Sequence, residues 1–500
     1  MTTDTFEFNR ITFGLPIESY RVDAFITRDE RLPVVTEYVL RLLKICNSLS
    51  LSALRDYFGF SDGETLSVVD SLKRQGLIEA SDESIVLSNF ALEKFEASGD
   101  DYPRFSKVEL RKDTVTFDLL SFTPLPSKSN TMLSDNVIRL TASDDVIGSS
   151  VEFAKAAYYK RFPEIARIAD GLKRDAINVY SVEDIQSKKR GFLPIPVSFS
   201  LNQEGQIDRY TEEAFEEGAA PELVKAFHEQ VSEVFPASQK AEIGTFEQFV
   251  DSFDLSFLWK YVVGNSFDLY RYAEDLKSGA LLAPKGVRPL FGNLYLPHNV
   301  EILTRRIRSQ RTDIRRGNLL TDVGWLSPEH EFWGRGEAFH QAVHEVNSAL
   351  SVTTHSELQL FAQAEEGQEA AVANVLKISE VRNLHFFRRA TVGDPAMQGR
   401  LELFLYPTGF VAALFHLSIP GNSTQWAPVG FVSALRKHTE TAHRLFELAA
   451  GGPNYGGRYS DNRNKGIQTQ DALFSEACGF LYFSDLRNKA STAIDEDASE

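Results

Sequence analysis

The densest group of residues that could do chemistry is a run of arginines. Six arginines fall within twelve positions, with Asp313 as the only acid among them: Arg305, Arg306, Arg308, Arg311, Arg315 and Arg316. At about 100° per residue, Leu303, Ile307 and Ile314 fall on one side of a helix and most of the arginines on the other. Guanidinium groups make forked hydrogen bonds to phosphate, so this helix is a candidate contact for a DNA backbone. The alternative is an exposed helix that pairs with acidic groups of this chain or of a partner.

A second candidate contact for nucleic acid lies near the C-terminus. Residues 451–466 contain five glycines together with side chains that could stack on bases or pair with phosphate. These are Tyr455, Arg458, Tyr459, Arg463 and Lys465. Stacking on aromatic rings tolerates any base, so such a stretch could lie along a strand of nucleic acid. A flexible surface loop has the same composition and is the alternative.

His340 and His344 have a spacing that is found in metal sites. Four positions apart on a helix, both rings project from one face, as in zinc-binding helices. The metalloprotease pattern has Glu directly after the first His, whereas this chain has Gln341. A solvated or core histidine pair is the ordinary alternative, and the sequence predicts no metal and no cofactor.

Several common catalytic motifs are absent from the chain. There is no GxxxxGK[ST] loop for a nucleoside triphosphate and no GxSxG turn for a nucleophilic serine. None of the ten histidines is followed two positions later by lysine, the pattern of phospholipase D-like nucleases. These absences favour a protein that is not an enzyme. The alternatives are a cryptic hydrolase or a degenerate phospholipase D-like nuclease fold.

Residues 32–97 have the clearest pattern of elements. Apolar residues recur at helical spacing from Val35 and Tyr38 to Cys46, and a second short helix follows a serine cap at Ser50. A third helix should end near Gly76, and two short strands with a polar turn follow. This order resembles the winged helix-turn-helix superfamily.

The resemblance implies DNA binding through the third helix, with Lys73 and Arg74 as contacts. However, the same helix carries Glu64 and Asp70, and the turn between the strands is acidic. Phosphate contacts supply most of the affinity for DNA and need positive charge. A module that docks protein partners is therefore the alternative.

Composition and pattern predict a mixed α/β, multidomain protein. Strands are expected at 356–363, 383–390, 401–407 and 410–419, a helix at 432–449, and a strand pair within 108–122. The predicted organisation is an N-terminal extension (1–31), a winged helix (32–97), an α+β middle domain (104–278), a C-terminal α/β domain (279–487) and an acidic disordered tail (488–500).

The composition also limits where the protein can be located and which partners it can bind. No apolar run could cross a membrane, the start of the chain does not look like a signal peptide, and Cys46 and Cys478 are expected to be buried thiols. These features predict a cytoplasmic protein. The net charge of −17 restricts any contact with DNA to local patches. We expect a DNA-associated accessory subunit of a bacterial multi-protein system, such as phage defence, with protein partners such as an ATPase or a nuclease. A protein–protein adaptor and a homo-oligomer are alternatives.

Overall fold

The computed structural model shows a mixed α/β protein, as predicted. The structure describes residues 5–30, 32–81, 84–98, 105–126, 136–170, 177–235, 243, 245–309, 323–353, 357–376, 383–387, 397, 399–407, 409–450, 455–459 and 467–468. The chain divides into two compact units of discontinuous segments. The first unit holds residues 1–16, 130–141 and 191–500, and the second holds 17–129 and 142–190. The predicted tail at 488–500 lies outside the described residues.

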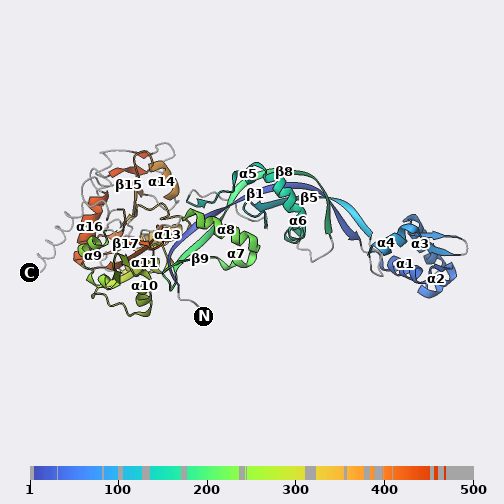
Figure 1. Ribbon diagram of the computed structural model, residues 1–500, viewed down its shortest axis with the longest axis horizontal. Helices are drawn as coiled ribbons and strands as arrows, with labels where there is room; N and C mark the ends of the chain where they lie inside the picture. Colours follow the sequence, from blue (N-terminus) through green and yellow to red (C-terminus); the bar gives the residue numbers. More distant parts are fainter. Residues whose placement is uncertain are drawn as a thin grey trace, which may run out of the picture. The chain divides into compact units, whose positions relative to one another are not determined.

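Residues 34–98 of the second unit form a small helical module, called here the N-terminal module (Figure 1). Its elements are α1 (Val34–Cys46), β2 (Ser48–Leu49), α2 (Leu51–Phe58), α3 (Asp62–Arg74), β3 (Ile78–Ala80), β4 (Ile85–Leu87) and α4 (Asn89–Ser98). The three strands make one antiparallel sheet in the order β2-β4-β3. The core is aliphatic and includes Leu43, Leu54 and Leu72. The three expected helices and two expected strands are present, and Cys46, expected to be buried, is exposed.

The rest of the second unit is a sheet covered by one helix. Strand β1 (Phe6–Glu30) pairs antiparallel with β5 (Phe105–Asp118), and β5 pairs antiparallel with the short β6 (Pro124–Leu125). Helix α6 (Ser150–Asp170) follows the short α5 (Asp144–Gly148), and its Tyr158 and Phe162 pack against the sheet. Pro163 lies inside α6 beside non-helical backbone at Arg161, because proline cannot donate the helical hydrogen bond.

Residues 6–30, which fall within the expected N-terminal extension (1–31), form a strand that continues from the first unit into the second. One expectation for this region was wrong. Residues 108–122, expected to turn back at Lys112, contain one strand that pairs with β1 from Glu30↔Phe105 to Ile17↔Asp118. The long antiparallel partner supplies hydrogen bonds through the position where a turn was expected.

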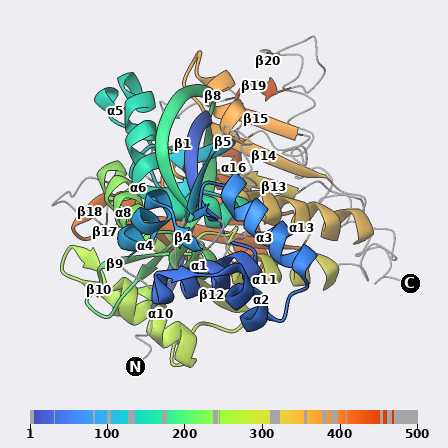
Figure 2. The same cartoon turned by 90° about the vertical axis from the view of Figure 1, so that its right-hand side faces the viewer.

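A nine-stranded sheet forms the centre of the first unit. Its strands are β12 (Val287–Phe291), β13 (Val323–Leu326), β14 (Leu358–Gln363), β15 (Asn383–Phe387), β16 (Leu401–Tyr406), β17 (Phe410–Ile419), β18 (Asn422–Ser433), β19 (Tyr455–Tyr459) and β20 (Ile467–Gln468). The order is β12-β18-β17-β16-β13-β14-β15-β19-β20. Strands β13, β14 and β15 lie side by side (Figure 2) and are parallel. Strand β16 pairs with β13 in the antiparallel direction.

Helices cover both faces of this sheet. Helices α11 (Pro297–Ser309) and α13 (Glu337–Thr353) share one core with Trp325 and Phe404. Helices α9 (Phe246–Phe253) and α16 (Arg436–Ala450) lie on the other face, where Phe253 contacts Phe431. Helix α14 (Glu369–Leu376) follows β14. The helix predicted at 432–449 is shorter, since β18 continues to Ser433.

The remaining elements of the first unit surround this sheet or pair with strands β1 and β8. They are β7 (Ile138–Arg139), β8 (Ile177–Leu201, which enters this unit at residue 191), β9 (Ile207–Thr211), α7 (Glu213–Gly218), α8 (Pro221–Val234), η1 (Ser256–Tyr261), β10 (Val262–Val263), β11 (Ser266–Phe267) and α10 (Leu269–Ser278). Among the described residues, no helix is both long enough and apolar enough to span a bilayer.

Candidate functional site

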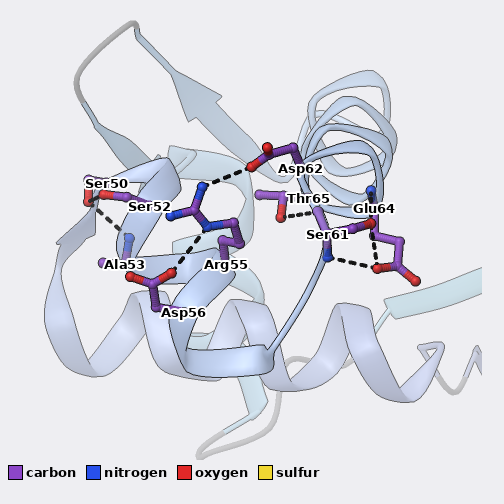
Figure 3. Close-up of polar contacts among 9 residues, drawn as sticks. All are labelled: Ser50, Ser52, Ala53, Arg55, Asp56, Ser61, Asp62, Glu64 and Thr65. Atoms are coloured by element: carbon purple, nitrogen blue, oxygen red, sulfur yellow. Dashed lines mark hydrogen bonds and ion pairs between the residues drawn. The ribbon is translucent and has the colours of Figure 1, made fainter.

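The start of α3 is closed by a reciprocal cap. Ser61 Oγ accepts a hydrogen bond from the Glu64 backbone at 3.3 Å, and Glu64 Oε2 accepts from the Ser61 backbone N–H at 2.8 Å (Figure 3). The cap fixes α3 because it satisfies donors that a helix start leaves unpaired. It also lowers the pKa of Glu64, so this carboxylate stays charged at the positive end of the helix.

The nearest cation on α2 is already neutralised. The guanidinium of Arg55 donates to Asp62 Oδ1 at 2.9 Å and to Asp56 Oδ1 at 3.1 Å (Figure 3). These carboxylates, Asp62 first, raise the pKa of Arg55. The first turn of α3 therefore presents carboxylates rather than a free cation.

The predicted DNA contacts on α3 lie at its opposite end. Lys73 and Arg74 are exposed in the last turn and form no ion pair within the described residues. Asp70 is exposed one turn earlier. The exposed face of α3 thus changes from acidic to basic along its length, which is not the continuous cationic face that phosphate contacts favour.

The N-terminal module exposes much apolar surface. Of twenty large hydrophobic side chains that are exposed in the described residues, eight belong to this module, and they are between 41% and 79% exposed. Four are on α1, and the other four are on α2, α3 and α4: Val34, Val35, Tyr38, Ile45, Tyr57, Leu66, Phe90 and Leu92. Val35 and Tyr38, two of the residues whose spacing predicted this helix, are exposed, and α1 buries Val39, Leu40 and Leu43 instead.

The arginine-rich segment is only partly within the described residues. Arg305 and Arg308 are exposed on α11 and Arg306 is half-buried, while Leu303 and Ile307 are buried, as predicted. Arg305 pairs with Glu301 one turn earlier. Arg311, Arg315 and Arg316 lie outside the described residues.

The predicted contacts are divided between the two units. Lys73 and Arg74 belong to the second unit, whereas Arg305, Arg306 and Arg308 belong to the first. Residues 455–459 form strand β19, which pairs with β15. The side chains of Tyr455, Arg458 and Tyr459, and residues Arg463 and Lys465, lie outside what the structure describes.

The histidine pair on α13 does not form a metal site within the described residues. His340 is half-buried and its Nε2 contacts the Asn136 amide, while His344 is exposed. Among the residues described, no group of three histidine, cysteine, aspartate or glutamate side chains could hold a metal ion.

A buried polar cluster lies inside the first unit. The carboxylate of Glu402 on β16 accepts hydrogen bonds from Trp325 Nε1 and His416 Nε2, each at 2.9 Å, and all three side chains are buried. Arg400 donates to the His416 carbonyl and to Ser418 Oγ, also at 2.9 Å. The two carboxylate oxygens are thus both satisfied, as buried charge requires.

His330 adjoins this cluster. Its Nε2 pairs with the Thr424 carbonyl at 2.9 Å, and its ring lies 4.3 Å from that of Trp426. Burial, with smaller effects of His416 and Arg400, lowers the pKa of His330 to about 3, so the ring is neutral near pH 7. Sequence reasoning missed this cluster because its members come from separate strands and have no shared motif.

Comparison with known proteins does not assign this chain to a family. No family model matches the sequence, and no curated protein matches it.

Proposed function

We propose that the chain is a protein–protein adaptor and that its N-terminal module is a winged helix that docks a protein partner. The element order α1-β2-α2-α3-β3-β4 and the sheet order β2-β4-β3 support the winged-helix assignment. The helices would then supply the docking surface.

The observation that carries this proposal is the exposed apolar surface. The module has 65 of the chain's 500 residues but eight of the twenty exposed large hydrophobic side chains in the described part. Scattered exposed hydrophobics are normal, whereas a concentration of them in one small module marks an interaction surface. Aromatic anchors such as Tyr38 and Tyr57 are typical of protein interfaces.

Charge favours a protein partner over DNA. The module has six lysines and arginines against ten aspartates and glutamates, and the start of α3 carries Asp62 and Glu64. This surface repels phosphate and attracts cations. The partner surface that fits it is apolar at its centre and basic at its rim.

A paired purification tests the proposal. The full-length chain is isolated from the cells that make it, after nuclease treatment, as wild type, as a Tyr38→Asp/Ile45→Asp variant and as a Leu282→Asp control. Leu282 is an exposed hydrophobic outside the module. We expect a stoichiometric partner with wild type and control and its loss with the double variant. Retention of that partner by a folded double variant contradicts the proposal.

DNA contact through α11 is a second candidate function. It is favoured by the exposed Arg305 and Arg308 on a helix whose opposite side is buried. Fluorescence anisotropy with labelled duplex and single-stranded DNA across a salt series measures it. If α11 contacts DNA, binding should be saturable and should weaken steeply with salt. The Arg305→Glu/Arg308→Glu variant should lose this binding. The control Arg436→Glu, which changes an exposed arginine of α16, should keep it. An unchanged affinity of the α11 variant excludes this contact.

A further inference from the structure

A cavity of about 290 Å³ lies at the carboxyl ends of two parallel strands in the first unit. Ser327 and Pro328 follow β13, and Ala362 and Gln363 end β14. Strand β13 has a parallel neighbour on one side and an antiparallel neighbour on the other. Open α/β sheets bind ligands outside the carboxyl ends of their parallel strands, which is where this cavity lies.

The walls of the cavity are mainly apolar. Val372, Val375 and Leu376 of α14 form one side, and Trp333 and Pro328 contribute another. A volume of this size is at the small end of ligand pockets, so it suits a small molecule rather than a nucleotide or a folded segment.

Arg335 supplies a cation to this cavity. Its Nε donates to the Glu331 carbonyl at 2.8 Å, but its Nη1 and Nη2 have no hydrogen-bond or ion-pair partner among the described residues. The side chain is half-buried: burial lowers its pKa, and the nearby charge of Glu331 raises it by less. The two terminal nitrogens still have hydrogen-bond donors to offer, and a carboxylate would accept two parallel hydrogen bonds from them.

The backbone around Arg335 is fixed by close packing. Gly334 and Gly336 both have left-handed φ values, +72° and +120°. A Cβ on Gly334 would lie 2.9 Å from Leu376 in the cavity wall, and one on Gly336 would lie 2.1 Å from Thr12 Oγ1. The Thr12 N–H donates to the Arg335 carbonyl at 3.1 Å. Arg335 is therefore held beside the cavity by the fold, as a binding residue needs to be.

The other polar lining residues limit the charge of a ligand. Glu329 and Glu331 also line the cavity, and His330 is neutral near pH 7. The Arg335 guanidinium can pair locally with one carboxylate, whereas Glu329 and Glu331 repel a polyanion. We propose that this cavity binds a small apolar monocarboxylate, with its carboxylate on Arg335 and its body against α14.

Isothermal titration calorimetry on the full chain tests this site. The probes are hexanoate and phenylacetate, the matched neutral phenylacetamide, and inorganic phosphate. We expect at least one of the two carboxylates to bind, and the amide and phosphate to bind at least tenfold more weakly. Equal binding of phenylacetate and its amide, or no binding of either carboxylate, overturns the proposal.

Variants locate the binding. Arg335→Gln should weaken carboxylate binding at least tenfold, whereas Arg288→Gln, an exposed arginine on β12, should leave it unchanged. Val375→Trp should fill the cavity from α14 and abolish carboxylate binding. The carboxylate should therefore no longer raise the Tm of this variant. Wild-type affinity in a folded Arg335→Gln or Val375→Trp protein contradicts the assignment.

Discussion

Replacing His330 by glutamine should make the first unit more resistant to mild acid. Its pKa of about 3 in the folded protein lies well below the value near 6.5 of an unfolded histidine. Because the unfolded chain then binds a proton that the folded chain does not, stability falls as the pH falls from about 7 toward 3. Between pH 8 and pH 5 this one group should lower the free energy of unfolding by about 2 kcal/mol.

Urea unfolding followed by tryptophan fluorescence measures this effect in the first unit alone. All four tryptophans, at 259, 325, 333 and 426, belong to that unit. His330→Gln should lose about 2 kcal/mol less than wild type between pH 8 and pH 5, while His344→Gln, at an exposed site, should match wild type. An equal acid loss in His330→Gln and wild type would refute a half-buried imidazole that stays neutral at this position.

Three further predictions concern the caps and buried groups. Glu402→Leu should lower the free energy of unfolding of the first unit by about 3 kcal/mol, because it leaves His416 buried without its acceptor, and the urea midpoint measures this. Ser61→Ala should destabilise the N-terminal module by about 1 kcal/mol, seen as faster amide hydrogen exchange in α3, and unchanged exchange would contradict the cap. Gly336→Ala should lower the Tm more than Gly205→Ala, which has a left-handed φ but open space, and equal effects would exclude the steric contact.

The N-terminal module could be predicted because its signals are local. Helical spacing, the cap at Ser50 and the glycine at 76 each act within a few residues, and the helices and strands appear where these signals placed them. Spacing did not show which side of α1 is buried. That choice depends on α2, α3 and the sheet, against which Val39, Leu40 and Leu43 pack while Tyr38 stays exposed.

The sheets and the cavity could not be predicted, because they join distant segments. Strand β1 is stabilised by pairing with β5, about 90 positions later in the chain. Because the stabilising partner is so distant, no local turn or cap marks residues 6–30 as part of a sheet. The cavity combines Arg335 with α14 and the end of β14, and neither its volume nor the position of the Arg335 guanidinium has a sequence pattern. Pattern reasoning therefore favoured the arginine run on α11, where similar residues are adjacent in sequence.

A photo-crosslinking amino acid at position 38 of α1 tests the central claim most directly. The full-length chain is irradiated in the cells that make it, with the same group at position 282 as the control, and adducts to protein and to nucleic acid are both identified. The docking account predicts one protein adduct of defined mass at position 38 and none at position 282. A nucleic-acid adduct at position 38, or the same products at both positions, would contradict it.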